Sequence, residues 1–206
     1  NQNLNLNGDG FYDLALSTAY MQSGTGIHDT GFKVESSDPL AGYFINRAGF
    51  STDMTYLFDD TSLGKDYVVA SHGTGHGEGS QIAVHATKDN TTVNIKPTVG
   101  PNINVNLNAG ESYTYVGGTT DLTGSQVSAS ENVAVFSGHS CADIPTNARS
   151  YCDTIVEQMI PIDRLSTSYL LTASEGAGIA SLGYDLIKVV ATEDNTVITV
   201  GGVDVA

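Results

Sequence analysis

Residues 86–95 read ATKDNTTVNI, and residues 191–200 read ATEDNTVITV. An upstream stretch is repeated too, because GFKVESSDPLAGYF at 31–44 has a counterpart in GSQVSASENVAVFS at 124–137. Between these anchors, the Leu and Tyr of LGKDYVV (63–69) match those of LSTSYLL (165–171). The separation begins near 93 residues and grows to about 105, so the second copy carries extra residues. A repeat of about 100 residues has the size of a β domain rather than of a short solenoid repeat.

Short alternating runs dominate both copies, as in IAVHAT (82–87), INVNLN (103–108) and TVITV (196–200). These runs are rich in β-branched residues and are bounded by Gly, Asn, Asp and Ser, which is typical of an antiparallel sandwich or barrel. The DNT stretches at 89–91 and 194–196 each predict a hairpin turn, because Asp and Asn tolerate the left-handed conformation. We therefore predict a mainly β, antiparallel sandwich-type fold built from two related halves, residues 1–123 and 124–206.

One segment, SYCDTIVEQMI at 150–160, is compatible with either a helix or a strand. Its Val156, Met159 and Ile160 would fall on one helical face. Both interpretations remain open from the sequence.

The chain has two cysteines, Cys141 and Cys152, with ten residues between them. The intervening ADIPTNARSY has the composition of a loop, which could bring the two thiols together. A disulfide in an oxidising compartment fits this pattern best, and the alternatives are two buried thiols or a metal pair.

The composition is strongly acidic, with 23 Asp and Glu against eight Lys and Arg and a formal net charge of −15. Such a chain would repel phosphate backbones and anionic lipid surfaces, so we expect neither nucleic-acid binding nor membrane insertion. No run approaches the 18 or so apolar residues of a membrane span. The charge suits a secreted protein that binds calcium or cationic ligands, or one that is simply kept soluble. Because it opens at Asn1 without a leader, we expect an excised or processed fragment, monomeric as excised.

Oxygen-bearing residues alternate in NLNGDGFYD at 5–13. Side chains of Asn5, Asn7, Asp9 and Asp13, with the carbonyl of Phe11, have the spacing by which a short loop surrounds one Ca²⁺ ion. The stretch resembles the calcium loops of FG-GAP-type repeats, with Asn5 in place of the usual first Asp. Two carboxylates predict weak affinity, with Kd of roughly 10⁻⁴ to 10⁻³ M. The alternative is a plain Asn/Gly turn.

A second loop, SHGTGHGEGSQ at 71–81, is rich in glycine. It lacks the Lys-Ser/Thr ending of a phosphate-binding loop. A zinc site from His72, His76 and Glu78 would lack a fourth ligand, so a mobile surface loop is the favoured interpretation.

The second half resembles the IgGFc-binding family of extracellular domains. In the second copy the resemblance rests on Phe136, Gly138, Cys141, Ala142, Pro145, Cys152, Asp153, Val156, Glu157 and Gln158. The first copy matches more loosely, through Ser37, Asp38, Pro39, Asp53, Leu63, Gly64 and Tyr67, so the resemblance covers roughly residues 28–206. The chain departs from the family pattern at its N-terminus, where the calcium-like loop stands, and at Phe58-Asp59, where Leu-Pro is expected. The resemblance implies an extracellular or cell-surface, mostly β, ligand-binding or adhesion module of a larger protein, without implying Fc binding.

We expect no catalysis. His139 and Cys141 share a strand face, but Cys152 offers that thiol a disulfide partner, and no nucleophile elbow or HExxH motif is present. The second half differs from the first mainly between Phe136 and Leu165, and we place recognition there. The expected ligand-binding residues are His139, Asp143, Arg149 and Glu157, and the expected partner is a protein, peptide or glycan. The alternative function is a structural spacer with no ligand of its own.

Overall fold

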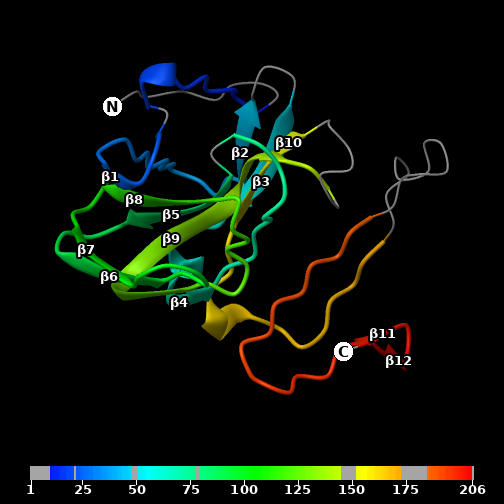
Figure 1. Ribbon diagram of the computed structural model, residues 1–206. Coiled ribbons are helices and arrows are strands. Elements are labelled where there is room, and N and C mark those ends of the chain that lie inside the picture. The colour runs from blue at the N-terminus through cyan, green and yellow to red at the C-terminus, as the bar shows by residue number, and fades with distance from the viewer. Residues whose placement is uncertain are drawn as a thin grey trace.

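The computed structural model describes residues 10–20, 22–47, 51–77, 79–144, 152–172 and 185–205. Its centre is an antiparallel sheet of eight strands in the order β1-β8-β5-β9-β6-β7, with β4 and β10 also paired to β9 (Figure 1). The mainly β, antiparallel fold expected from the sequence is confirmed. The sheet strands are β1 (Gly26–His28), β4 (Gly64–Val68), β5 (Ser80–Ala86), β6 (Thr91–Lys96), β7 (Ile103–Leu107), β8 (Ser112–Gly118), β9 (Gln126–Ala142) and β10 (Asp153–Gln158).

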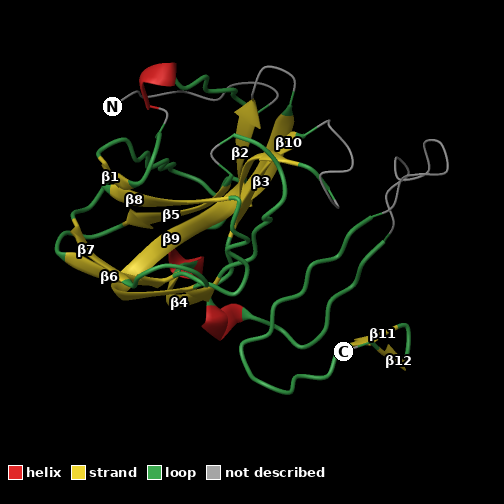
Figure 2. Ribbon diagram, viewed as in Figure 1, coloured by secondary structure: helices red, strands yellow, loops and turns green. Residues whose placement is uncertain are grey.

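Two further strand pairs lie outside this sheet in the described part of the chain. These are β2 (Gly42–Arg47) with β3 (Thr52–Leu57), and β11 (Thr199–Val200) with β12 (Val203–Asp204). Among the described residues, the helical content is three short 3₁₀ turns, η1 (Thr18–Tyr20), η2 (Asp60–Ser62) and η3 (Ile162–Arg164), and loops make up much of the remainder (Figure 2). Within the described ranges, no helix is long and apolar enough to cross a membrane.

Alternation along the strands builds the core. In β5, alternate residues from Ser80 to Ala86 are buried, which places Ile82 and Val84 on one face. In β6, Val93 and Ile95 are buried in the same way, and β9 adds Val127, Val133 and Val135. All these side chains belong to one hydrophobic cluster, so the curved sheet encloses a single core.

The turn at 89–91 forms, but it does not close a hairpin. Asn90 has φ of 56°, in the left-handed region, and the Thr91 hydroxyl donates to the Lys88 carbonyl over 2.7 Å. β5 and β6 do not pair with each other, because they pair with successive stretches of β9, residues 133–139 and 126–129. The predicted hairpin is therefore wrong at this position, since the chain crosses there from one part of the sheet to the other.

The long strand β9 connects the two predicted halves. It lies at the start of residues 124–206, yet it pairs with β4, β5 and β6 of residues 1–123 (Figure 1). Its ladders with β5 and β6 leave residues 130–132 without a Cα partner. The division into two halves stays a prediction. The eight-stranded sheet includes a strand, β9, that lies beyond the predicted boundary at residue 123.

The segment 150–160 contains a strand. Its residues Asp153–Gln158 form β10, antiparallel to β9, with Val156 opposite Gly138. The close approach requires glycine on β9, because a Cβ at Gly138 would lie 1.9 Å from the carbonyl oxygen of Ile155.

Candidate functional site

One face of the β2–β3 hairpin carries large side chains that remain exposed. Tyr43 lies opposite Tyr56 in the ladder, and Ile45 lies opposite Met54. Because residues two apart in a strand point to the same side, all four side chains share this face. The two tyrosine rings meet edge to face with centroids 5.5 Å apart, and all four residues are exposed. We call these four residues the hairpin face.

The opposite side of the hairpin is fixed to β10 by side-chain to backbone hydrogen bonds. The backbone N–H of Gln158 donates to Thr55 Oγ1 over 3.0 Å, and that of Val156 donates to Asp53 Oδ2 over 2.7 Å. The side chain of Gln158 in turn accepts from the backbone N–H of Phe58 over 2.8 Å. These bonds replace a regular ladder between β3 and β10 and hold the hairpin face outward.

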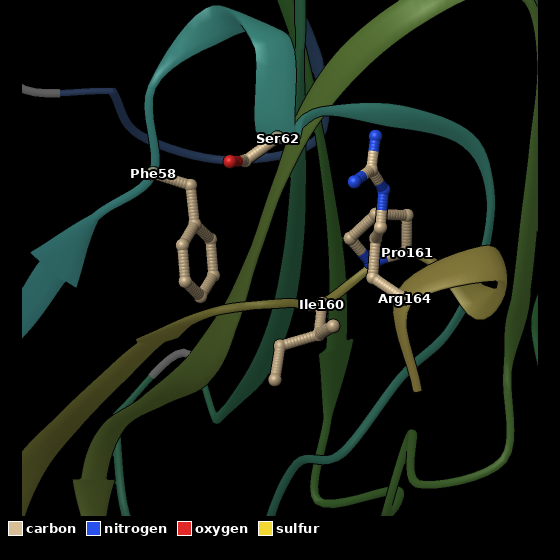
Figure 3. A pocket seen from close by; sticks show the side chains of 5 residues that line it. All are labelled: Phe58, Ser62, Ile160, Pro161 and Arg164. Atoms are coloured by element: carbon tan, nitrogen blue, oxygen red, sulfur yellow. The ribbon is translucent and has the colours of Figure 1, made fainter. Parts of the chain in front are cut away.

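A shallow pocket of about 260 Å³, whose lining side chains are drawn in Figure 3, lies next to the hairpin face. The ring of Tyr56 contacts that of Phe58, with centroids 5.8 Å apart, and Phe58 is one wall of the pocket. The pocket lies between the segments around η2 and η3, and its lining consists of Phe58, Ser62, Ile160, Pro161 and Arg164. Its walls are mainly apolar, with one guanidinium, that of Arg164.

The predicted disulfide is present. Cys141 at the end of β9 is bonded to Cys152 just before β10, with the two Cα atoms 4.9 Å apart. The Gly-rich loop 71–81 packs on this end of β9, because the N–H of His76 donates to the Cys141 carbonyl over 2.9 Å and that of Ser140 to the Gly79 carbonyl over 3.1 Å. In its described residues the loop is therefore bound to the sheet, contrary to the mobile loop that the sequence favoured.

A buried carboxylate lies beneath the loop. Asp143 is fully buried, and its carbonyl accepts from the Thr74 hydroxyl over 2.8 Å and lies 3.1 Å from Nε2 of His72. One carboxylate oxygen is 3.2 Å from Nε2 of His76, which is an ion pair when that imidazole is protonated. His139 is buried nearby, and its Nδ1 accepts from the Cys141 N–H over 3.0 Å. Burial, followed by the neighbouring His72, lowers the pKa of His139.

The expected binding residues have different environments. His139 and Asp143 are buried, so neither presents its side chain to a partner on the surface. Glu157 lies on β10, where it accepts from the Thr55 hydroxyl over 2.9 Å and where burial raises its pKa. Arg149 lies outside the described residues. A recognition role for these four residues stays a prediction.

The expected calcium ligands fall mostly outside the described residues. This applies to Asn5, Asn7 and Asp9, whereas Phe11 and Asp13 are described and exposed. Gly10 has φ of 73°, as a sharp bend requires. No group of three or more His, Cys, Asp or Glu is placed to hold a metal ion within the described ranges.

Sequence reasoning missed the hairpin face. The signal was present in GYFINR (42–47) and TDMTYLF (52–58), where Tyr43 and Ile45, and Met54 and Tyr56, occupy alternate positions. Alternation does not tell which of the two faces of an isolated hairpin meets solvent.

Comparison with known proteins gives one family. The family model described as IgGFc binding protein matches residues 53–206. A human protein described as IgGFc-binding protein is 29% identical over 183 residues, covering 82% of this chain and 3% of the relative. The chain thus spans a small fraction of the length of that relative. No solved structure matches the chain significantly.

Proposed function

Because this chain belongs to the IgGFc binding protein family, we propose that it is an extracellular module whose activity is to bind a protein partner. The family takes its name from binding rather than catalysis, and the disulfide fits an oxidising, extracellular setting. We propose that this binding serves adhesion by a larger surface or secreted protein of which the chain is a module. The name of the relative describes that whole protein, of which this chain spans 3%. Immunoglobulin Fc is therefore one of several proteins to be tested for binding.

The observation that carries the proposal is the hairpin face with its adjoining pocket. Tyrosine, methionine, phenylalanine and arginine are the residue types enriched in protein–protein interfaces. The hairpin face supplies Tyr43, Met54 and Tyr56, and the pocket adds Phe58 and Arg164. An anchor side chain from a partner would fill the pocket while the tyrosines cover it, which is the arrangement of interface hot spots. A structural spacer would have no use for such an exposed face.

The negative charge of the chain indicates which residues should surround the contact surface of the partner. Asp59, Asp60 and Asp163 are exposed around the pocket, and the whole chain carries a net charge of −15. A partner with basic residues around its contact surface would associate faster, and added salt would slow that association.

Alanine variants on the hairpin face test the proposal. Binding is measured against an array of secreted proteins that includes immunoglobulin Fc, first with the full chain and then with Tyr43→Ala and Tyr56→Ala. Each variant should weaken a true partner at least about tenfold, or about 1.4 kcal/mol. Tyr12→Ala is the matched control, because Tyr12 is an equally exposed tyrosine far along the chain from the hairpin.

The proposal fails if the array yields binders whose affinities are the same for both hairpin variants and the control. It fails also if nothing on the array binds the full chain, in which case the spacer function gains support. Melting curves of the variants check that loss of binding is not loss of folding.

We further propose calcium as a stabilising ion of the N-terminal loop. The support is the spacing of oxygen donors from Asn5 to Asp13 and the left-handed Gly10 at the bend. In the same way, the two related halves remain our proposal for how the chain is organised, supported by the repeated sequence.

A further inference from the structure

Two local motifs recur at corresponding positions of the repeat. After η2, the hydroxyl of Tyr67 accepts a hydrogen bond from the Gly64 N–H over 2.8 Å. After η3, the hydroxyl of Tyr169 accepts from the Ser166 N–H over 2.9 Å. Each 3₁₀ turn also ends at a leucine, Leu63 or Leu165, with extended backbone. At these positions the second copy therefore has the same local hydrogen bonds and backbone geometry as the first.

The turn between the repeated strands recurs as well. Asn195 has φ of 61°, matching Asn90, and the Thr196 hydroxyl donates to the Glu193 carbonyl over 2.8 Å, as Thr91 does in the first copy. The residues before this turn, 185–191, correspond to β5, and those after it correspond to β6. The local geometry is present, but residues 185–198 belong to no sheet.

The copies differ in what covers their apolar side chains. Ile82 is fully buried in the first copy, whereas its counterpart Ile187 is 54% exposed. Tyr67 is 1% exposed, whereas Tyr169 is 60% exposed. Val189 and Val200 are exposed likewise, although their counterparts Val84 and Ile95 are fully buried. The second copy thus presents a strand-pairing surface, residues 165–172 and 185–200, which we call the acceptor.

In the first copy, β9 covers the corresponding surface. It pairs with β4, β5 and β6, and the Tyr67 hydroxyl donates to the Val133 carbonyl over 2.6 Å. The strand that completes the first copy is therefore the opening strand of the second copy. By the same rule, the opening strand of another copy would cover the acceptor.

The opening strand of the first copy is available for this role. Residues 31–44 correspond to 124–137, so Val34 and Leu40 correspond to Val127 and Val133. Val127 and Val133 are buried in the core, whereas Val34 is 66% and Leu40 50% exposed. We call residues 31–41 the donor. The described residues 33–41 form no strand, so their backbone takes part in no ladder.

Proline in the donor falls where pairing permits it. Pro39 corresponds to Asn132, and residues 130–132 of β9 have no Cα partner in the ladders with β5 and β6. Proline cannot donate to a ladder, so it is tolerated only at such a break.

We propose that the donor of one copy of this chain adds as a β-strand to the acceptor of a second copy, as β9 adds to the first half. The partner is thus a second copy of this chain, joined by strand addition. In the joined pair, the Tyr169 hydroxyl donates to the Leu40 carbonyl, and Val34 and Leu40 cover Ile187 and Val189. The donor and the acceptor contain none of the four hairpin-face residues, so the proposal goes beyond the proposed function and is tested by different residues.

Two complementary variants of the full chain test the proposal. The donor variant carries Val34→Asp and Leu40→Asp, and the acceptor variant carries Ile187→Asp and Val189→Asp. All four side chains are exposed in the single chain, so each variant should fold, which melting curves verify. Analytical ultracentrifugation over a concentration series should show the unaltered chain rising from the mass of one chain towards two or more. Each variant alone should stay at the mass of one chain at every concentration.

Mixing the two variants gives the decisive result. Each retains one working surface, so an equimolar mixture should form a pair of two chains, one of each variant. A monomeric mixture overturns the proposal, as does an unaltered chain that stays monomeric throughout the series. Variants that still associate alone overturn it too, because another surface must then hold the copies together.

A cysteine pair tests the register. Val133 lies opposite Ala86 in the first half, so Leu40 of one copy should lie opposite Ala191 of the other. Leu40→Cys and Ala191→Cys chains, mixed and oxidised, should form a mixed disulfide detected by mass spectrometry. Val197→Cys in place of Ala191→Cys is the control, and equal cross-linking with it contradicts the strand register.

Discussion

Thr55 and Gln158 connect β3 to β10 by a hydrogen bond of 3.0 Å, in which the backbone N–H of Gln158 donates to the threonine hydroxyl. Both residues are buried, and the same hydroxyl donates to Glu157 Oε1 over 2.9 Å. One small side chain thus joins the hairpin to the sheet at a point that carries no regular ladder. Together with the hydrogen bonds of the Asp53 and Gln158 side chains, it positions the hairpin face.

Replacing Thr55 by valine should be strongly destabilising. The two side chains have nearly the same shape, but valine leaves the Gln158 N–H buried without an acceptor, at a cost of about 1–3 kcal/mol. We expect the melting temperature to fall by roughly 2–4 °C for each 1 kcal/mol lost. Thr52→Val on the exposed side of β3 is the control and should change little. Equal effects of the two variants would show that the Thr55 bond contributes nothing.

Removing the disulfide should lower the stability of the whole sheet. Its cysteines are 11 residues apart, and closing a loop of that length is worth about 3 kcal/mol in the chain-entropy view. Urea unfolding of Cys141→Ser with Cys152→Ser should give a midpoint well below that of the oxidised chain. Reductant should shift the natural chain to a similar midpoint and leave the double variant unchanged. A reductant effect on the double variant would contradict this interpretation.

Replacing Gly138 by alanine should separate β10 from β9. The added Cβ would lie 1.9 Å from the Ile155 carbonyl oxygen, so the strands must move apart, and overpacking of this kind costs typically about 1–3 kcal/mol. Gly42→Ala in β2 is the matched control, because its Cβ would meet only side-chain atoms of Leu57 at 3.4 Å and beyond. Thermal unfolding should show a large loss for Gly138→Ala and little for Gly42→Ala, and the reverse order would refute the packing argument.

Stability should fall as the pH drops below about 6.5. Burial lowers the folded-state pKa of His139, with His72 and His76 acting in the same direction and Asp143 and Asp121 opposing them. The unfolded chain therefore binds the proton first, near the ordinary histidine pKa of about 6.5, and the unfolding free energy declines until the pH passes below the folded pKa. The slope attributable to one histidine is at most about 1.4 kcal/mol per pH unit.

His139→Asn tests that pH dependence. Asparagine can still accept from the Cys141 N–H, but it does not titrate. The slope of unfolding free energy between pH 7 and 5, a range that spans the ordinary histidine pKa of about 6.5, should decrease. Burial also lowers the pKa of His85, so that residue should preserve part of the slope. An unaltered slope would mean that His139 takes up no proton on unfolding.

Calcium should raise the melting temperature if the N-terminal loop binds it. A site occupied at a hundred times its Kd stabilises by about 2.7 kcal/mol, provided that the unfolded chain does not bind. Asp9→Ala and Asp13→Ala should remove the shift, and magnesium at the same concentration should not reproduce it. Identical melting curves with calcium and with chelator would end the proposal.

Local features were predictable from the sequence, and long-range pairing was not. Strands β5 to β9, the left-handed Asn90 turn and the Cys141–Cys152 bond follow from residue types within short windows, whereas of the alternating run 196–200 only Thr199–Val200 forms a strand. The pairing of β5 and β6 with successive parts of β9 joins residues 30 to 59 positions apart in the sequence. The alternation of residues along a single strand carries no information about such distant partners. A hairpin was therefore expected where the chain crosses the sheet.

The site was less predictable for the same reason. Sequence divergence directed attention to the cysteine-bracketed insertion, where His139 and Asp143 prove to be buried. The hairpin face faces solvent only because Thr55 and Asp53 on its other side bind the backbone of β10, about 100 residues away. No property of the hairpin sequence itself reveals which side of the hairpin is bound to β10.

The place of β9 in the sheet also sets the order in which a growing chain can fold. Val127, Val133 and Val135 complete a cluster whose other members lie mostly upstream, so the early strands must wait on the ribosome until residue 139 or so has been made. At ~5–20 residues per second, that wait lasts seconds, during which β5 and β6 expose unpaired edges. A chain cut before β9 should therefore be a substrate for chaperones rather than a stable domain.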